Sequence, residues 1–222
     1  MLTGLKNMPN AWRKAWESKP FRNHLALSLL ALIGVMAYQF HYLRLWESRL
    51  GVPVNDFVQN LLPPIDFSVP IFVLEYSCLL LVFIYVLTEP ERLVKGLQMF
   101  VLIILARTVT VYFVPLEPPQ DMIFLKDPMA SLFLHTEDVQ VTKDLFFSGH
   151  VSAITLLALL AGNRYLKYYV VFSLFAVSVM IVWQHVHYSM DVAFATIVSY
   201  TTFRFVEWWH AQTKYGLQLQ DA

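Results

Sequence analysis

The sequence predicts an all-α, polytopic integral membrane protein with six transmembrane helices. Of its 222 residues, 57% are hydrophobic and only 14% are charged, which is too apolar for an ordinary soluble domain. Six apolar runs are also long enough to cross a bilayer whose hydrocarbon core is about 30 Å thick. They cover approximately residues 23–43, 67–88, 93–115, 147–163, 167–185 and 190–209. Because nothing separates these runs into domains, we expect one six-helix unit over residues 23–210.

The segment before the first apolar run has the composition of an interfacial helix. Residues 1–22 carry five basic side chains against the single Glu17, and Trp12 and Trp16 share one helical face. Tryptophan at headgroup level and cations on anionic lipid are typical of a helix that lies on a membrane surface. We therefore expect residues 1–22 to form a cytoplasmic interfacial segment.

The distribution of lysine and arginine predicts the orientation. Basic residues flank the runs at the N-terminus, at the second connection and at the fourth connection, whereas the loop 116–146 holds six acidic residues and two lysines. Since short cytoplasmic loops are enriched in Lys and Arg, both termini should be cytoplasmic, including a tail at 211–222. The loops 44–66, 116–146 and 185–190 should then lie on the opposite, non-cytoplasmic face.

Two polar motifs begin the fourth and sixth runs, and this topology brings both to the non-cytoplasmic face. The first reads Asp-Leu-Phe-Phe-Ser-Gly-His over residues 144–150, and the second reads His-Val-His-Tyr-Ser-Met-Asp over residues 185–191. On a helix, His187 and Asp191 lie one turn apart on the same face, so the carboxylate can orient the imidazole. His150 supplies a second imidazole.

Two ionisable residues lie inside predicted spans. By rise per residue, Glu75 in the second run and Arg107 in the third lie at the same depth, roughly 12 Å below the outer interface. A charge at that depth is costly unless it is paired or meets a ligand. Either the two neutralise each other, or Arg107 contacts a phosphate while Glu75 faces a cationic headgroup or orients a catalytic histidine.

Together these residues can carry out phosphoryl transfer. A neutral imidazole oriented by a carboxylate is a competent nucleophile, which assigns His187 as nucleophile and Asp191 as its partner. His150 would protonate the departing oxygen and then deprotonate the acceptor hydroxyl. Ser148 and Gly149 open a helix, where hydroxyl and backbone N–H groups bind phosphoryl oxygens.

The two motifs, the segment Arg-Thr-Val-Thr-Val-Tyr at 107–112 and the six runs resemble the sphingomyelin synthase family. That family belongs to the type 2 phosphatidate phosphatase-like superfamily of lipid phosphatases and phosphotransferases. The resemblance covers roughly residues 95–210. It implies transfer of a phosphorylated headgroup from a glycerophospholipid to ceramide or another lipid alcohol. The transfer would release diacylglycerol and pass through a phosphohistidine intermediate, with no metal or other cofactor. His187, Asp191 and His150 take the catalytic positions.

The sequence departs from that family at one point and leaves the headgroup open. Thr142-Lys143 replaces the Cys-Gly that often precedes the aspartate in animal members, so a choline donor is not assumed. Candidate headgroup contacts are Asp144, for an amine or a hydroxyl, and the rings of Tyr188 and Tyr112, for a quaternary ammonium.

Other functions remain open at the sequence level. A lipid phosphatase or phospholipase C-type hydrolase of the same superfamily is the nearest alternative, although two cations typical of the phosphatases are replaced by Phe100 and Ile181. A metal site on the histidines and a transporter or scaffold are weaker alternatives. Balanced charge, sixteen basic and sixteen acidic residues, gives no sign of a nucleic-acid partner. A homo-oligomer is compatible with the sequence. The histidine His185 is either a supporting donor or an interfacial residue.

Overall fold

The computed structural model describes residues 2–125 and 142–212, and the regular elements of these residues are helices joined by irregular loops. The middle of the predicted 116–146 loop, residues 126–141, falls outside them, as does the predicted tail beyond residue 212. The described elements are the α-helices α1 (Leu2–Glu17), α2 (Lys19–Glu47), α3 (Ser68–Val86), α4 (Pro90–Phe113), α6 (Gly149–Leu160), α7 (Arg164–Trp183) and α8 (Ser189–Gln212), and the 3-10 turn η1 (Gln59–Leu61).

The helices from α2 to α8 fall on the six apolar runs of the sequence. Four of them contain a segment long and apolar enough to cross a membrane: Lys19–Gln39 within α2, and the whole of α3, α4 and α7. The fourth run yields a shorter helix than expected, because α6 has 12 residues and is about 18 Å long. Helix α8 has the length but not the apolarity. The structure thus supports an integral membrane protein, while six spans and cytoplasmic termini remain predictions.

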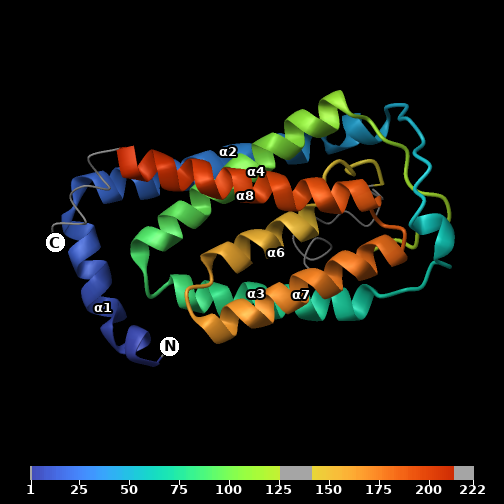
Figure 1. Cartoon of the computed structure of the whole chain (residues 1–222). Coiled ribbons are helices and arrows are strands. Elements are labelled where there is room, and N and C mark those ends of the chain that lie inside the picture. The colour runs from blue at the N-terminus through green and yellow to red at the C-terminus, as the bar shows by residue number, and fades with distance from the viewer. Residues whose placement is uncertain (1, 126–141, 213–222) are drawn as a thin grey trace.

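The short helix α6 forms the centre of the bundle. It packs against α3, α4, α7 and α8, which surround it in Figure 1. Most of its side chains are buried, and they contribute Val151, Ile154 and Leu157 to the largest hydrophobic core. A helix that is apolar all round must be enclosed by other helices or by lipid. The start of α6, where Gly149 and His150 end the first histidine motif, is therefore positioned by the surrounding helices.

Local sequence signals account for where several helices begin. The hydroxyl of Ser148 caps α6 by accepting a hydrogen bond from Val151 N at 3.4 Å. The side chain of Asn163 caps α7 in the same way, and Pro90 occupies the start of α4, where no N–H donor is needed.

The N-terminal segment forms a separate helix, α1, that contacts the bundle near its junction with α2. Trp12 Nε1 donates to Leu87 O at 2.8 Å, and its ring packs edge-on against Phe21. Trp16, on the same face, keeps 54% of its surface exposed. A helix is therefore present where the interfacial segment was expected; its placement on a membrane remains a prediction.

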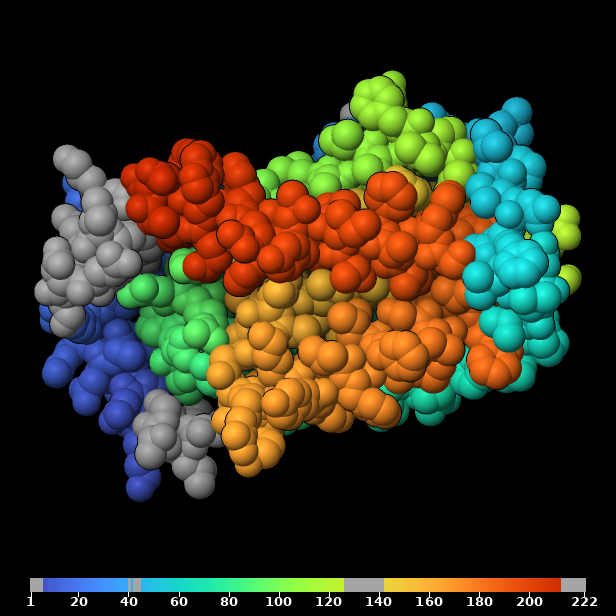
Figure 2. Space-filling view, in the orientation of Figure 1, coloured from blue at the N-terminus to red at the C-terminus, as the bar shows by residue number. Residues whose placement is uncertain are grey.

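The connections gather at two ends of the bundle (Figure 1). One end holds α1, the α3–α4 and α6–α7 links and the last turn of α8. The other, here named the loop end, holds residues 48–67, 114–125 and 184–188, and Figure 2 shows residues 48–67 covering it. Both histidine motifs lie toward this end, in contact with each other, and the membrane face that it occupies remains a prediction.

Candidate active site

The second motif places a histidine and an aspartate in a buried pair. His187 lies in the turn between α7 and α8, Asp191 lies in the first turn of α8, and His187 Nδ1 is 3.5 Å from Asp191 Oδ2. Asp191 Oδ2 also accepts a hydrogen bond from Tyr188 N at 3.0 Å. Within the described residues, His187 Nδ1 has no hydrogen-bond partner, because 3.5 Å is longer than an ordinary hydrogen bond to oxygen.

Burial decides the charge of the His187 ring, which is only 5% exposed. Burial lowers the pKa of His187 below its usual value of 6.5, the carboxylate of Asp191 raises it, and the nearby positive charges of Arg107 and His150 lower it again. The ring is therefore neutral near pH 7, which is the form that can act as a nucleophile.

The first motif contributes a second histidine–carboxylate pair. His150 is the second residue of α6, and its Nδ1 lies 2.8 Å from Glu75 Oε2 on α3. The ring also lies edge-on to Phe72. Both side chains of the pair retain some exposure, 24% for His150 and 15% for Glu75. Of the roles open to Glu75, this geometry favours the one in which the carboxylate orients a histidine.

Arg107 pairs with the aspartate of the first motif instead of with Glu75. Arg107 Nη2 lies 2.7 Å from Asp144 Oδ2 and 3.4 Å from Asp144 O. The other guanidinium nitrogen, Nη1, is buried without a hydrogen-bond partner among the described residues, and so is Asp144 Oδ1. An unpaired buried donor on a charged group is costly in the protein alone, so these atoms are the places where a ligand would be most stabilising.

The unpaired nitrogen of Arg107 lies against the first residue of α6. A Cβ atom added to Gly149 would come within 2.3 Å of Arg107 Nη1, so the close approach requires glycine at this position. The N-terminus of α6 adds backbone N–H groups that point out of the helix start and the positive end of the helix dipole. A guanidinium and a helix N-terminus together form a site suited to an oxyanion.

The two motifs are joined through Ser148. Its backbone N donates to Asp191 O at 3.3 Å, which links the start of α6 directly to the first turn of α8. Its side chain is fully buried, and its Oγ acts as the helix cap described above. The start of α6, next to His150, therefore lies against the first turn of α8 that carries Asp191.

The predicted aromatic headgroup contacts have other partners. The ring of Tyr188 is buried, and its hydroxyl donates to Glu117 O at 2.9 Å. Tyr112 is 59% exposed, and its ring lies under the guanidinium of Arg49 at 5.1 Å. Both rings are thus engaged by partners outside the histidine pairs, whereas Asp144 pairs with Arg107.

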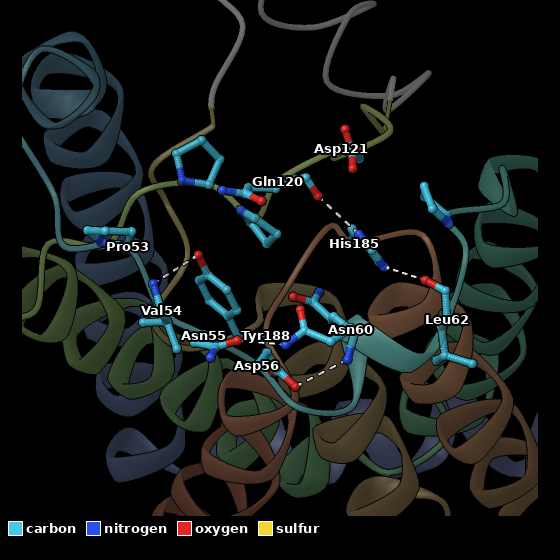
Figure 3. A pocket seen from close by; sticks show the side chains of 14 residues that line it. Pro53, Val54, Asn55, Asp56, Asn60, Leu62, Gln120, Asp121, His185 and Tyr188 are labelled. Atoms are coloured by element: carbon cyan, nitrogen blue, oxygen red, sulfur yellow. Dashed lines mark hydrogen bonds between the residues drawn. The ribbon is translucent and has the colours of Figure 1, made fainter.

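His185 holds two loops together at the loop end. Its Nδ1 lies 3.0 Å from Gln120 O and its Nε2 lies 3.1 Å from Leu62 O, as the dashed lines in Figure 3 show. Both partners are backbone carbonyls, which can only accept hydrogen bonds. His185 therefore supports the turn that carries His187, and its ring nitrogens are engaged by the loops.

Sequence reasoning missed two residues of the 48–67 loop that contact the His187 turn, Asp56 and Gln59. Gln59 Nε2 donates to His187 O at 3.0 Å, and Asp56 Oδ2 accepts from Ser189 N at 2.6 Å. These contacts join positions more than 120 residues apart, and no local motif marks either residue.

In residues 2–125 and 142–212, no group of three or more His, Cys, Asp or Glu side chains is arranged to hold a metal ion. The predicted catalytic residues lie in two histidine–carboxylate pairs: His187 with Asp191, and His150 with Glu75, which the sequence left as a headgroup contact, a partner of Arg107 or a histidine-orienting residue.

Comparison with known families gives a match over the segment that holds both motifs. No individual curated protein matches the chain. The family described as PAP2 superfamily C-terminal matches residues 143–209, a segment that contains both histidine motifs. Arg107 and Glu75 lie outside the matched segment. Members of this superfamily are phosphatases and phosphotransferases, and the match shows that this segment is similar to theirs.

Proposed function

We propose that the protein is a membrane lipid phosphotransferase of the sphingomyelin synthase type. It would move a phosphorylated headgroup from a glycerophospholipid to ceramide and release diacylglycerol. The observation that carries this proposal is the unpaired, buried Nη1 of Arg107 at the N-terminus of α6, in the same site as two histidine–carboxylate pairs. The guanidinium of Arg107 can bind the phosphoryl oxygens. One histidine can attack phosphorus while the other exchanges a proton with the departing or entering oxygen.

In the first half-reaction His187 attacks phosphorus. The neutral ring uses Nε2, because Nδ1 faces Asp191. A P–N bond forms, the P–O bond to diacylglycerol breaks, and protonated His150 delivers its proton to the departing oxygen. His187 becomes a cationic phosphohistidine, and the carboxylate of Asp191 stabilises that charge.

In the second half-reaction the acceptor takes the place of the departed diacylglycerol. His150, now neutral, removes the proton from the primary hydroxyl of ceramide, and the resulting oxygen attacks phosphorus. The new P–O bond forms as the P–N bond to His187 breaks, so His150 is again protonated and His187 is again neutral. Glu75 stabilises the protonated form of His150 in both steps.

The charge of the site favours a phosphodiester donor over a phosphomonoester. One nitrogen of Arg107 is already paired with Asp144, which neutralises part of its charge. Lys143, the basic residue beside Asp144, has its ammonium on Glu117 Oε1 at 3.0 Å and Arg49 O at 2.7 Å. A phosphodiester carries one negative charge and suits a single half-neutralised guanidinium better than the dianion that a lipid phosphatase binds.

Both substrates carry two acyl chains, so they would reach the site sideways from the bilayer. The partial exposure of His150, Glu75 and Asp144 is compatible with such a route. We place this site on the non-cytoplasmic face, because the basic flanks of the apolar runs lie at the other end of the bundle.

Lipid mass spectrometry on the purified protein tests the function. The assay supplies labelled ceramide, a mixture of choline, ethanolamine, glycerol and inositol phospholipids, and excess EDTA. A labelled phosphosphingolipid formed in equal amount with diacylglycerol is expected, and it would identify the donor. Release of phosphorylated headgroup without a ceramide product would instead assign the protein to the hydrolases of the superfamily. A requirement for added metal would overturn the histidine mechanism.

A further inference from the structure

The loop end contains a buried hydrogen-bond network that the reaction steps above do not use. We propose that Gln59 and Asp56 are positioning residues, which fix the turn between α7 and α8 and so set the geometry of the pair formed by His187 and Asp191. The structural part of this inference stands on contacts alone; its effect on turnover rests on the proposed function.

The side-chain amide of Gln59 bonds to backbone carbonyls at the turn between α7 and α8. The side chain is only 5% exposed, and Nε2 donates to His187 O at 3.0 Å and to Val182 O at 3.4 Å. Val182 lies in the last turn of α7, and His187 is the proposed nucleophile. One amide group therefore spans the turn and fixes the backbone of His187 relative to the end of the preceding helix.

Asp56 holds the start of α8 and orients Gln59. Its Oδ2 accepts from both Ser189 N at 2.6 Å and Ser189 Oγ at 2.7 Å. Its Oδ1 accepts from Val58 N at 2.9 Å and Gln59 N at 3.4 Å. The carboxylate thus joins η1 to the first turn of α8, which is the turn that carries Asp191, and it does so from an 8% exposed position.

These contacts fix the backbone at His187 and again two residues later at Ser189. His187 is held by its own carbonyl, and Ser189, two residues later, is held by its amide and hydroxyl. The distance from His187 Nδ1 to Asp191 Oδ2 is 3.5 Å, at the outer limit of a hydrogen bond. A small displacement of the turn therefore decides whether Asp191 can orient the imidazole, and Gln59 and Asp56 control that displacement.

A neighbouring residue provides a matched control. Asn60 lines the same outer pocket as Asp56 and Gln59, and Figure 3 shows it beside Asp56. Its side chain is exposed and donates to Asn55 Oδ1, within the loop itself, so it makes no hydrogen bond to the turn that carries His187. Gln59→Met and Asn60→Met each replace an amide by an unbranched apolar side chain, and only the first removes donors from the turn.

The test combines turnover with backbone hydrogen–deuterium exchange of the intact protein in detergent. In Gln59→Met we expect kcat to fall by about tenfold or more with KM changed less than about twofold, since misplacing a catalytic group affects the chemical step. We also expect faster exchange in peptides covering residues 184–191. Asn60→Met should match the original protein in both measurements. Unchanged kcat in a folded Gln59→Met protein would overturn the positioning role.

A second variant and the exchange measurement test the role of Gln59 if the first variant does not fold or the protein transfers no headgroup. If Gln59→Met does not fold, Gln59→Glu keeps the side-chain size but presents an oxygen to the His187 carbonyl, and the same rise in exchange is expected; protection equal to the original protein would overturn the proposal. If the original protein transfers no headgroup from any lipid, the proposed function fails. The exchange measurement then still decides whether Gln59 holds the turn.

Discussion

Replacing Arg107 with lysine separates the two tasks of its guanidinium. In the structure Nη2 pairs with Asp144, while Nη1 is buried, unpaired and directed at the start of α6. Lysine offers one nitrogen in place of this fork, so it can keep the pair with Asp144 but cannot also reach the phosphoryl group. The variant should fold and bind lipid but stabilise the transition state less.

The loss can be estimated from the contact that disappears. A hydrogen bond to a charged group contributes about 1.5–3 kcal/mol, and about 1.4 kcal/mol corresponds to a factor of ten in rate. We therefore expect kcat/KM for headgroup transfer to fall by about 10- to 150-fold in Arg107→Lys. The assay is the rate of labelled phosphosphingolipid formation, with thermal unfolding in detergent to confirm the fold.

Arg92→Lys is the matched control on the same helix. Arg92 lies near the start of α4, at the end of the bundle opposite the loop end, where it pairs with Glu89 at 2.8 Å and donates to Leu160 O. Its replacement should leave kcat/KM within about twofold. A folded Arg107→Lys protein with the kcat/KM of the original protein would refute the reasoning that Nη1 binds the phosphoryl group.

Three further predictions follow from the same geometry. Glu75→Gln should lower kcat by about ten- to a hundredfold in the transfer assay, because the amide stabilises protonated His150 less than the carboxylate does; an unchanged kcat would remove Glu75 from the mechanism. Burial holds the pKa of His187 below 6.5, so its neutral form persists as the pH falls past 6.5. The acid limb of the kcat/KM–pH profile should therefore have its midpoint below 6.5. A midpoint above 6.5 would contradict this assignment. Burial alone would raise the pKa of Asp56, but hydrogen bonds, chiefly from Ser189, outweigh it and hold the pKa below 3.8. Its ionised form therefore stabilises the fold above that pH, so the difference in Tm between the original protein and Asp56→Asn should shrink as the pH falls through 3.8 and below; a constant difference would exclude that linkage.

Much of the fold could be predicted from the sequence, because apolar runs and helix-start residues act locally. The fourth run was expected over 147–163, and the helix within it is Gly149–Leu160. Hydropathy marks where apolar residues continue but not where a helix stops. Asn163 caps the next helix, so α6 ends before it. The length of α6 therefore depends on a turn that hydropathy does not detect.

The pairing of the charged residues was only partly predictable. The i, i+4 spacing indicated the pair of His187 with Asp191, which the structure shows at 3.5 Å, although His187 lies in the turn before α8 and not on the helix itself. Depth within the spans brought Glu75 and Arg107 to one level but left their partners open, since equal depth does not specify which helices face each other. In the structure they pair with His150 and Asp144.

The positioning contacts of Gln59 and Asp56 could not be predicted at all. Both residues lie in a loop whose shape depends on the packing of the whole loop end, and both act mainly on backbone groups of another segment. A hydrogen bond to a backbone carbonyl leaves no pattern in the sequence of the acceptor, because every residue has such a carbonyl.

Trapping of the covalent intermediate tests the central claim most directly. The purified protein is mixed with a glycerophospholipid that carries a ³²P-labelled headgroup, without acceptor, and quenched in base, where a phosphohistidine survives better than in acid. The mechanism predicts label on the peptide that contains His187 and none in the His187→Ala protein. Headgroup transfer by the original protein with the label on another residue, or with no labelled protein at any time, would contradict it.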